Sequence, residues 1–72
     1  MFILSQGKKG IFNLDNIATL VVSRNYGEGK EKKFSIVASG VILGFYPDEG
    51  AAQKELVKIL AAIENDEKVY EL

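Results

Sequence analysis

Short apolar runs alternate with polar, glycine-bearing segments over residues 1–46 of the chain. Runs of this length, rich in β-branched and aromatic residues, predict strands. We expect five of them, over Phe2–Ser5, Ile11–Phe12, Ile17–Ser23, Phe34–Ala38 and Val41–Tyr46. The third run has the clearest strand pattern. Both of its faces are fairly apolar: residues 17, 19 and 21 form one face, and residues 18, 20 and 22 form the other. We therefore expect both faces to be covered.

The polar segments between these runs predict turns. Gln6–Gly10 and Tyr26–Lys33 contain glycine and several charges, which is typical of hairpin loops. Ser39–Gly40 predicts a two-residue turn, because glycine adopts positive φ without strain. Asn13–Asn16 holds three Asn or Asp side chains, which bond to nearby backbone and predict a corner before the third strand.

After Tyr46 the apolar spacing becomes that of a helix. One stripe is formed by Ala52, Leu56, Ile59, Leu60 and Ile63. Asp48 suits the N-cap position, where its side chain can accept backbone N–H groups, and Glu49 is favourable in the first turn. We expect the helix to end near Asn65, because the acidic residues around it are unfavourable at a helix C-terminus.

The order of elements predicts an α+β fold in a single domain over residues 1–72. We expect a single antiparallel sheet of about five strands, with the one C-terminal helix packed on it. Val69–Leu72 either adds a strand or docks elsewhere. One helix covers one face of a sheet, so the other face either curls into a roll or meets another chain.

Composition excludes several kinds of chemistry. The 72 residues include no cysteine and no histidine, so thiol nucleophiles, Cys-ligated zinc and histidine general bases are excluded. Gly27–Lys30 resembles the end of a phosphate-binding loop, but Arg24 and Glu31 stand where that motif needs Gly and Ser or Thr. We expect no catalytic residues, no cofactor and no metal, and hence no enzyme.

Targeting signals are also missing from the pattern. The apolar start of the chain is broken at Ser5, and the longest apolar-rich stretch, residues 34–46, is too short to span a bilayer. We expect a cytoplasmic protein that does not enter a membrane.

Charge is distributed unevenly along the chain. Residues 1–36 hold six Lys or Arg and three acids, whereas residues 37–72 hold three Lys and seven acids. Five lysines lie in the two predicted hairpin loops and flank aromatic residues, as in proteins that bind single-stranded nucleic acid: Lys8, Lys9, Lys30, Lys32 and Lys33. This binding is the alternative function.

The residues at several positions along the chain resemble those of a known family. They are Ile3-Leu4-Ser5-Gln6, Asn13, Ile17, Leu43-Gly44-Phe45-Tyr46, Ala52 and Leu56. The pattern is similar to a family of short uncharacterised proteins of Gram-positive bacteria and their phages, although Gly7 stands where an acidic residue is usual. The resemblance implies a small β-rich domain with a C-terminal helix and a phage origin for some members. It implies no activity and no functional residue.

The sequence favours a non-enzymatic binding or assembly module that presents a sheet edge or an open sheet face. The expected partner is a second copy, forming a homodimer, or an unidentified protein. The segment 68–72 is the candidate contact, with Val69, Tyr70 and Leu72 as its interface residues. On this hypothesis, deleting residues 66–72 lowers the assembly state.

Overall fold

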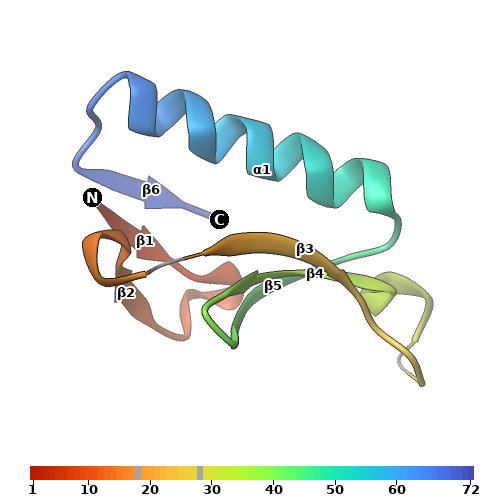
Figure 1. The fold of residues 1–72 in the computed structure, drawn as a ribbon. Coiled ribbons are helices and arrows are strands. Elements are labelled where there is room, and N and C mark those ends of the chain that lie inside the picture. The colour runs from red at the N-terminus through yellow and green to blue at the C-terminus, as the bar shows by residue number, and fades with distance from the viewer. Residues whose placement is uncertain (18, 28) are drawn as a thin grey trace.

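The computed structural model describes residues 1–17, 19–27 and 29–72. Within them the chain forms two three-stranded sheets and one long helix (Figure 1). The first sheet has the order β2-β1-β6 and the second has the order β3-β4-β5. The strands are β1 (Phe2–Leu4), β2 (Ile11–Asn13), β3 (Leu20–Arg24), β4 (Phe34–Ala38), β5 (Val41–Tyr46) and β6 (Val69–Glu71). The helix is α1 (Glu49–Glu64), and three single 3₁₀ turns are η1 (Gln6–Lys8), η2 (Leu14–Asn16) and η3 (Lys30–Lys32).

The expectation of one antiparallel five-stranded sheet is wrong. The corner at Asn13–Asn16 forms η2, where the Asn13 side chain accepts a hydrogen bond from the Asp15 N–H at 3.0 Å. This turn ends the β1–β2 hairpin and sends the chain into a separate sheet with β3. The C-terminal segment forms β6 and pairs in parallel with β1, so the first sheet is mixed rather than antiparallel.

The third strand is shorter than the sequence predicts. The strand begins at Leu20 rather than Ile17 and extends to Arg24. Leu20 and Val22 pack against the core, whereas Val21 on the opposite face is about half exposed. The expectation that both faces of this strand are covered is therefore wrong at Val21. Ala18 lies outside the described residues.

The other predicted elements are confirmed. Strands β4 and β5 have the expected bounds and flank the turn at Ser39–Gly40, where Gly40 has φ of 89°. Asp48 caps α1 by accepting a 2.7 Å hydrogen bond from the Ala51 N–H, and the helix ends before Asn65. Each of these elements follows from local spacing and capping, which the sequence contains directly.

Helix α1 lies across one face of the β3-β4-β5 sheet (Figure 1). The core between them contains the fully buried Ile36, Leu43 and Ile59, and Ile3 of β1 completes it. The predicted stripe on α1 is only partly buried. Ile59 is inaccessible, but Leu60 and Ile63 are about half exposed.

Candidate interaction surfaces

The two outer strands of the β3-β4-β5 sheet differ in how their edges are covered. At β5 the Gln6 side chain acts like a short strand: its Oε1 accepts from the Phe45 N–H at 2.7 Å and its Nε2 donates to the Phe45 carbonyl at 3.0 Å. Strand β3 has no strand beside its outer edge in the described part of the chain. An uncovered edge presents unpaired N–H and C=O groups that can pair with another chain.

An apolar groove of about 300 Å³ runs between α1 and β3, and we call it the α1–β3 groove. It is lined by Leu20, Leu56, Val57, Ile59, Leu60 and Ile63. Val57, Leu60 and Ile63 are 64%, 54% and 47% exposed, which is unusual for three apolar side chains on one helix. The apolar face of α1 thus extends past β3 on the side where the strand edge is open.

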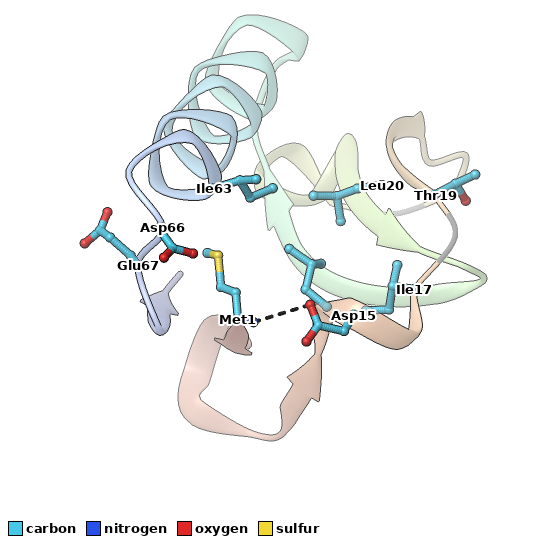
Figure 2. A pocket seen from close by; sticks show the side chains of 9 residues that line it. Met1, Asp15, Ile17, Thr19, Leu20, Ile63, Asp66 and Glu67 are labelled. Carbon is cyan, nitrogen blue, oxygen red and sulfur yellow. Dashed lines mark ion pairs between the residues drawn. The ribbon is translucent and has the colours of Figure 1, made fainter.

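A second cavity of about 370 Å³, the acidic pocket, continues this groove, since Leu20 and Ile63 line both. Figure 2 shows these two side chains facing its interior, together with Met1 and Ile17. Three carboxylates border it, from Asp15, Asp66 and Glu67.

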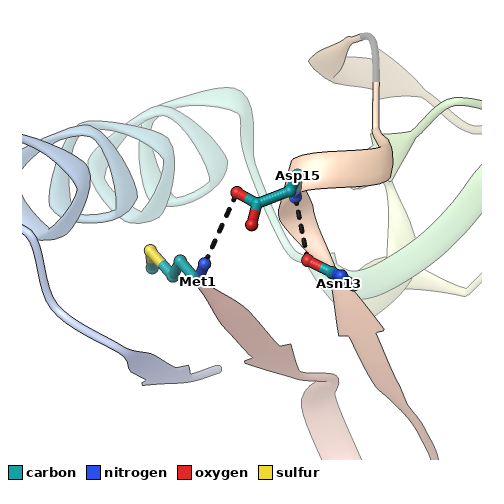
Figure 3. A network of polar contacts seen from close by, with 3 residues as sticks. All are labelled: Met1, Asn13 and Asp15. Carbon is teal, nitrogen blue, oxygen red and sulfur yellow. Dashed lines mark hydrogen bonds and ion pairs between the residues drawn. The ribbon is translucent and has the colours of Figure 1, made fainter.

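Only one of those carboxylates has an ion-pair partner among the described residues. The Asp15 carboxylate lies 3.6 Å from the amino group of Met1, and the η2 turn that holds Asp15 is fixed by the Asn13 side chain (Figure 3). The pocket therefore combines an apolar floor with a negatively charged border.

The predicted lysines are partly brought together. Lys9 and Lys32, from different loops, line one groove of about 320 Å³ over β5, which we call the basic groove. Phe12 and Phe45 line the same groove, and the Lys32 Nζ lies 5.0 Å from the centre of the Phe45 ring.

The remaining three lysines lie outside that groove. Lys8 pairs with Glu71 at 3.8 Å, while Lys30 and Lys33 are exposed at or beside η3.

The three C-terminal residues predicted to contact another chain have different environments. Val69 is 62% exposed and points away from the core. Tyr70 and Leu72 are half-buried and pack against the core of their own chain. A contact through Val69 stays a prediction, whereas the other two side chains already have intramolecular neighbours.

Tyr70 also bonds to α1. Its hydroxyl donates a short hydrogen bond to the Glu55 carboxylate, which fastens β6 to the helix. Burial raises the pKa of Tyr46 to about 12, with a further contribution from the nearby negative charge of Glu55. Burial raises the pKa of Tyr70 in the same direction, and the hydrogen bond to Glu55 adds to it. Both phenols are therefore neutral at physiological pH and suit a structural role.

No group of three His, Cys, Asp or Glu side chains in the described ranges is placed to hold a metal ion. Within those ranges, no helix has the length and apolar character needed to cross a membrane. No family model, curated protein or solved structure matches the chain.

Sequence reasoning missed the β3 edge, the acidic pocket and the Gln6 contact. Leu60 and Ile63 belong to the stripe that the sequence predicts to be buried, whereas Val57 lies outside that stripe. The Gln6 contact joins residues 39 positions apart and has no local signature.

Proposed function

We propose that this protein is a non-enzymatic assembly module that works as a homodimer, with two copies joined along β3. The observation that carries the proposal is the position of the α1–β3 groove directly above the open edge of β3. Backbone pairing at the edge and apolar packing in the groove occur on the same side of the molecule, so one partner satisfies both.

A second copy fits this surface by symmetry. In a two-fold dimer the same patch meets itself, so β3 pairs antiparallel with β3 of the partner and the two α1 helices approach each other. The two three-stranded sheets then form one six-stranded sheet. Val57 and Leu60, which are exposed to solvent in a single copy, become buried between the two helices of the dimer.

Charge complementarity selects the register. With Val22 on the two-fold axis, Arg24 of one copy lies opposite Leu20 of the other, and the two arginines stay apart. Arg24 projects on the same face of β3 as Leu20, and Leu20 lines the acidic pocket. In one copy the Arg24 guanidinium lies over the Tyr26 and Phe34 rings, and we expect it to turn in the dimer toward the carboxylates of the partner's acidic pocket.

The test is the mass in solution, measured by light scattering during size-exclusion chromatography. We expect a dimer for the unaltered chain and a monomer for Leu60→Glu, because a charge in the α1–β3 groove disfavours burial. Val69→Glu is the matched control: it places the same charge on an exposed apolar residue of the other sheet, and should leave the dimer intact. A monomeric wild type, or dissociation by Val69→Glu alone, contradicts the proposal.

A charge exchange separates interface effects from misfolding. Arg24→Glu should weaken the dimer by placing a carboxylate against the acidic pocket, and adding Glu67→Lys should restore part of the affinity. A folding defect would not be rescued in this way. Failure of the second substitution to recover any dimer would argue against the proposed register.

A further inference from the structure

We propose that the basic groove binds single-stranded nucleic acid, with Lys9 and Lys32 on phosphates and Phe45 against a base. This surface lies at β5, the outer strand opposite β3. The inference is therefore independent of the proposed homodimer.

The two lysines are supplied by loops that are fixed to the sheet. The loop with Lys9 is closed by the Ser5 hydroxyl, which accepts from the Gly10 N–H at 3.0 Å, and by the two hydrogen bonds between Gln6 and Phe45. These contacts hold the loop beside β5 without any ligand. A binding surface that is formed in advance loses less conformational entropy on binding.

The loop with Lys32 is fixed in a comparable way. The Asn25 side chain donates to the Lys32 carbonyl at 3.0 Å and accepts from the Ser35 hydroxyl at 3.2 Å, and Ser35 is fully buried in β4. Both loops that line the groove are thus attached to the same sheet, so Lys9 and Lys32 line the same groove.

The groove also continues along the surface. A neighbouring hollow of about 420 Å³ shares Gln6, Lys32 and Phe45 with it and extends to Pro47. Glu31 lines this extension and is its one acidic residue. The basic groove together with this hollow therefore suits a ligand that is an extended chain better than a compact ligand.

The combination of aromatic rings and lysines favours nucleic acid over an acidic peptide. Bases stack on aromatic side chains while phosphates contact nearby cations. The Lys32 ammonium lies over the Phe45 ring, so a base that stacks on this ring must displace it from the ring face toward a phosphate. In a duplex the bases are already stacked on one another, so only single strands can use Phe45 in this way. The two loops, residues 6–10 and 26–33, hold five lysines and two glutamates, and this net positive charge adds long-range attraction for a polyanion.

The experiment measures binding of a short labelled oligothymidylate by fluorescence anisotropy over a range of salt concentrations. We expect Lys9→Gln/Lys32→Gln to weaken binding and to reduce the slope of log K against log salt by about 1.4, since each phosphate contact in a single strand contributes about 0.7. Lys54→Gln/Lys58→Gln, which removes two exposed lysines from α1, is the charge-matched control and should retain the wild-type slope.

A second variant tests the aromatic contact alone. Phe45→Leu keeps both lysines and most of the apolar packing, so affinity should fall on the order of tenfold with an unchanged salt slope. Circular dichroism establishes that each variant is folded. Three results overturn the proposal: no binding by the wild type at low salt, equal losses in the two lysine pairs, or lysine-dependent binding of oligoglutamate without binding of oligothymidylate.

Discussion

The side chain of Tyr46 lies in the core and brings a hydroxyl group there, whereas a phenylalanine would bring only the hydrocarbon ring. The side chain is 8% exposed, and its hydroxyl has no hydrogen-bond partner within the described residues. The neutral phenol tolerates this environment better than the phenolate, which is why the pKa of Tyr46 rises to about 12. A group with a raised folded-state pKa stabilises the fold below its unfolded pKa and loses that contribution at higher pH.

We therefore expect the free energy of unfolding to fall between about pH 10 and pH 12. The unfolded pKa of about 10 and the folded-state pKa of about 12 set the direction and the pH window of this loss for Tyr46. Denaturant titrations over this pH range test it. Tyr46→Phe should change stability little at pH 7, because the lost hydroxyl has no hydrogen-bond partner in the described residues. It should remove the Tyr46 share of the alkaline decline and leave the share of Tyr70, whose pKa is also raised.

Tyr26→Phe is the control for that experiment, since the Tyr26 side chain is exposed in a loop. A decline of equal steepness in Tyr46→Phe and Tyr26→Phe would show that burial of Tyr46 is not its cause.

At the scale of elements, the Gln6 side chain joins two parts of the fold that no strand connects. It lies in η1, next to β1, and satisfies both backbone groups of Phe45 in β5. This contact occupies the backbone groups of Phe45 at the β5 edge, which leaves β3 as the uncovered edge of the β3-β4-β5 sheet in the described part of the chain.

Gln6→Ala should remove both hydrogen bonds and lower the free energy of unfolding by about 1–2 kcal/mol, since each such bond contributes about 0.5–1.5 kcal/mol. Hydrogen exchange at the Phe45 amide should accelerate more than at amides within α1. Gln53→Ala, an exposed glutamine on α1, is the matched control and should leave Phe45 exchange unchanged. Equal exchange at Phe45 in both variants would contradict this role of Gln6.

The elements differ in how far the sequence specifies them. Strands β4 and β5 and helix α1 were predicted with close bounds, because β-branched runs, the Gly40 turn and the Asp48 cap act within a few residues. The pairing of β1 with β6 was not predicted, since Phe2 and Val69 meet across almost the whole chain and each strand has three residues. Local periodicity contains no information about such a partner.

The candidate surfaces also differ in how much of them the sequence specifies. The sequence identified the lysines of both hairpin loops, but only the fold shows that Lys9 and Lys32 line one groove. The α1–β3 groove was missed because residues 56, 60 and 63 share a stripe with buried Ile59. Whether such a residue is covered depends on which elements pack beside it, and this is a property of the assembled fold.

For the whole molecule, the C-terminal strand is part of the fold rather than a free contact segment. Strand β6 lies beside β1, and its Tyr70 bonds to Glu55 of α1. Deleting residues 66–72 should therefore abolish cooperative unfolding rather than only lower the assembly state, because β1 loses its paired strand and the core loses the packing of Tyr70 and Leu72.

Thermal denaturation followed by circular dichroism tests that expectation. The point substitution Val69→Glu, which keeps the β6 backbone, should still unfold cooperatively. A folded, cooperative truncated chain would show that β6 is dispensable for the core and would return residues 68–72 to the role of an accessory contact.

The parallel pairing of β1 and β6 also determines how the molecule responds to tension. The Phe2 N–H donates to the Lys68 carbonyl at 2.8 Å, and the Leu72 N–H donates to the Leu4 carbonyl at 3.0 Å. A force that pulls β1 from its beginning and β6 from its end acts along the two strands in opposite directions. The hydrogen bonds between them are then loaded together in shear instead of opening one after another, so we expect this short strand pair to resist such a force more strongly than a pair that opens one bond at a time.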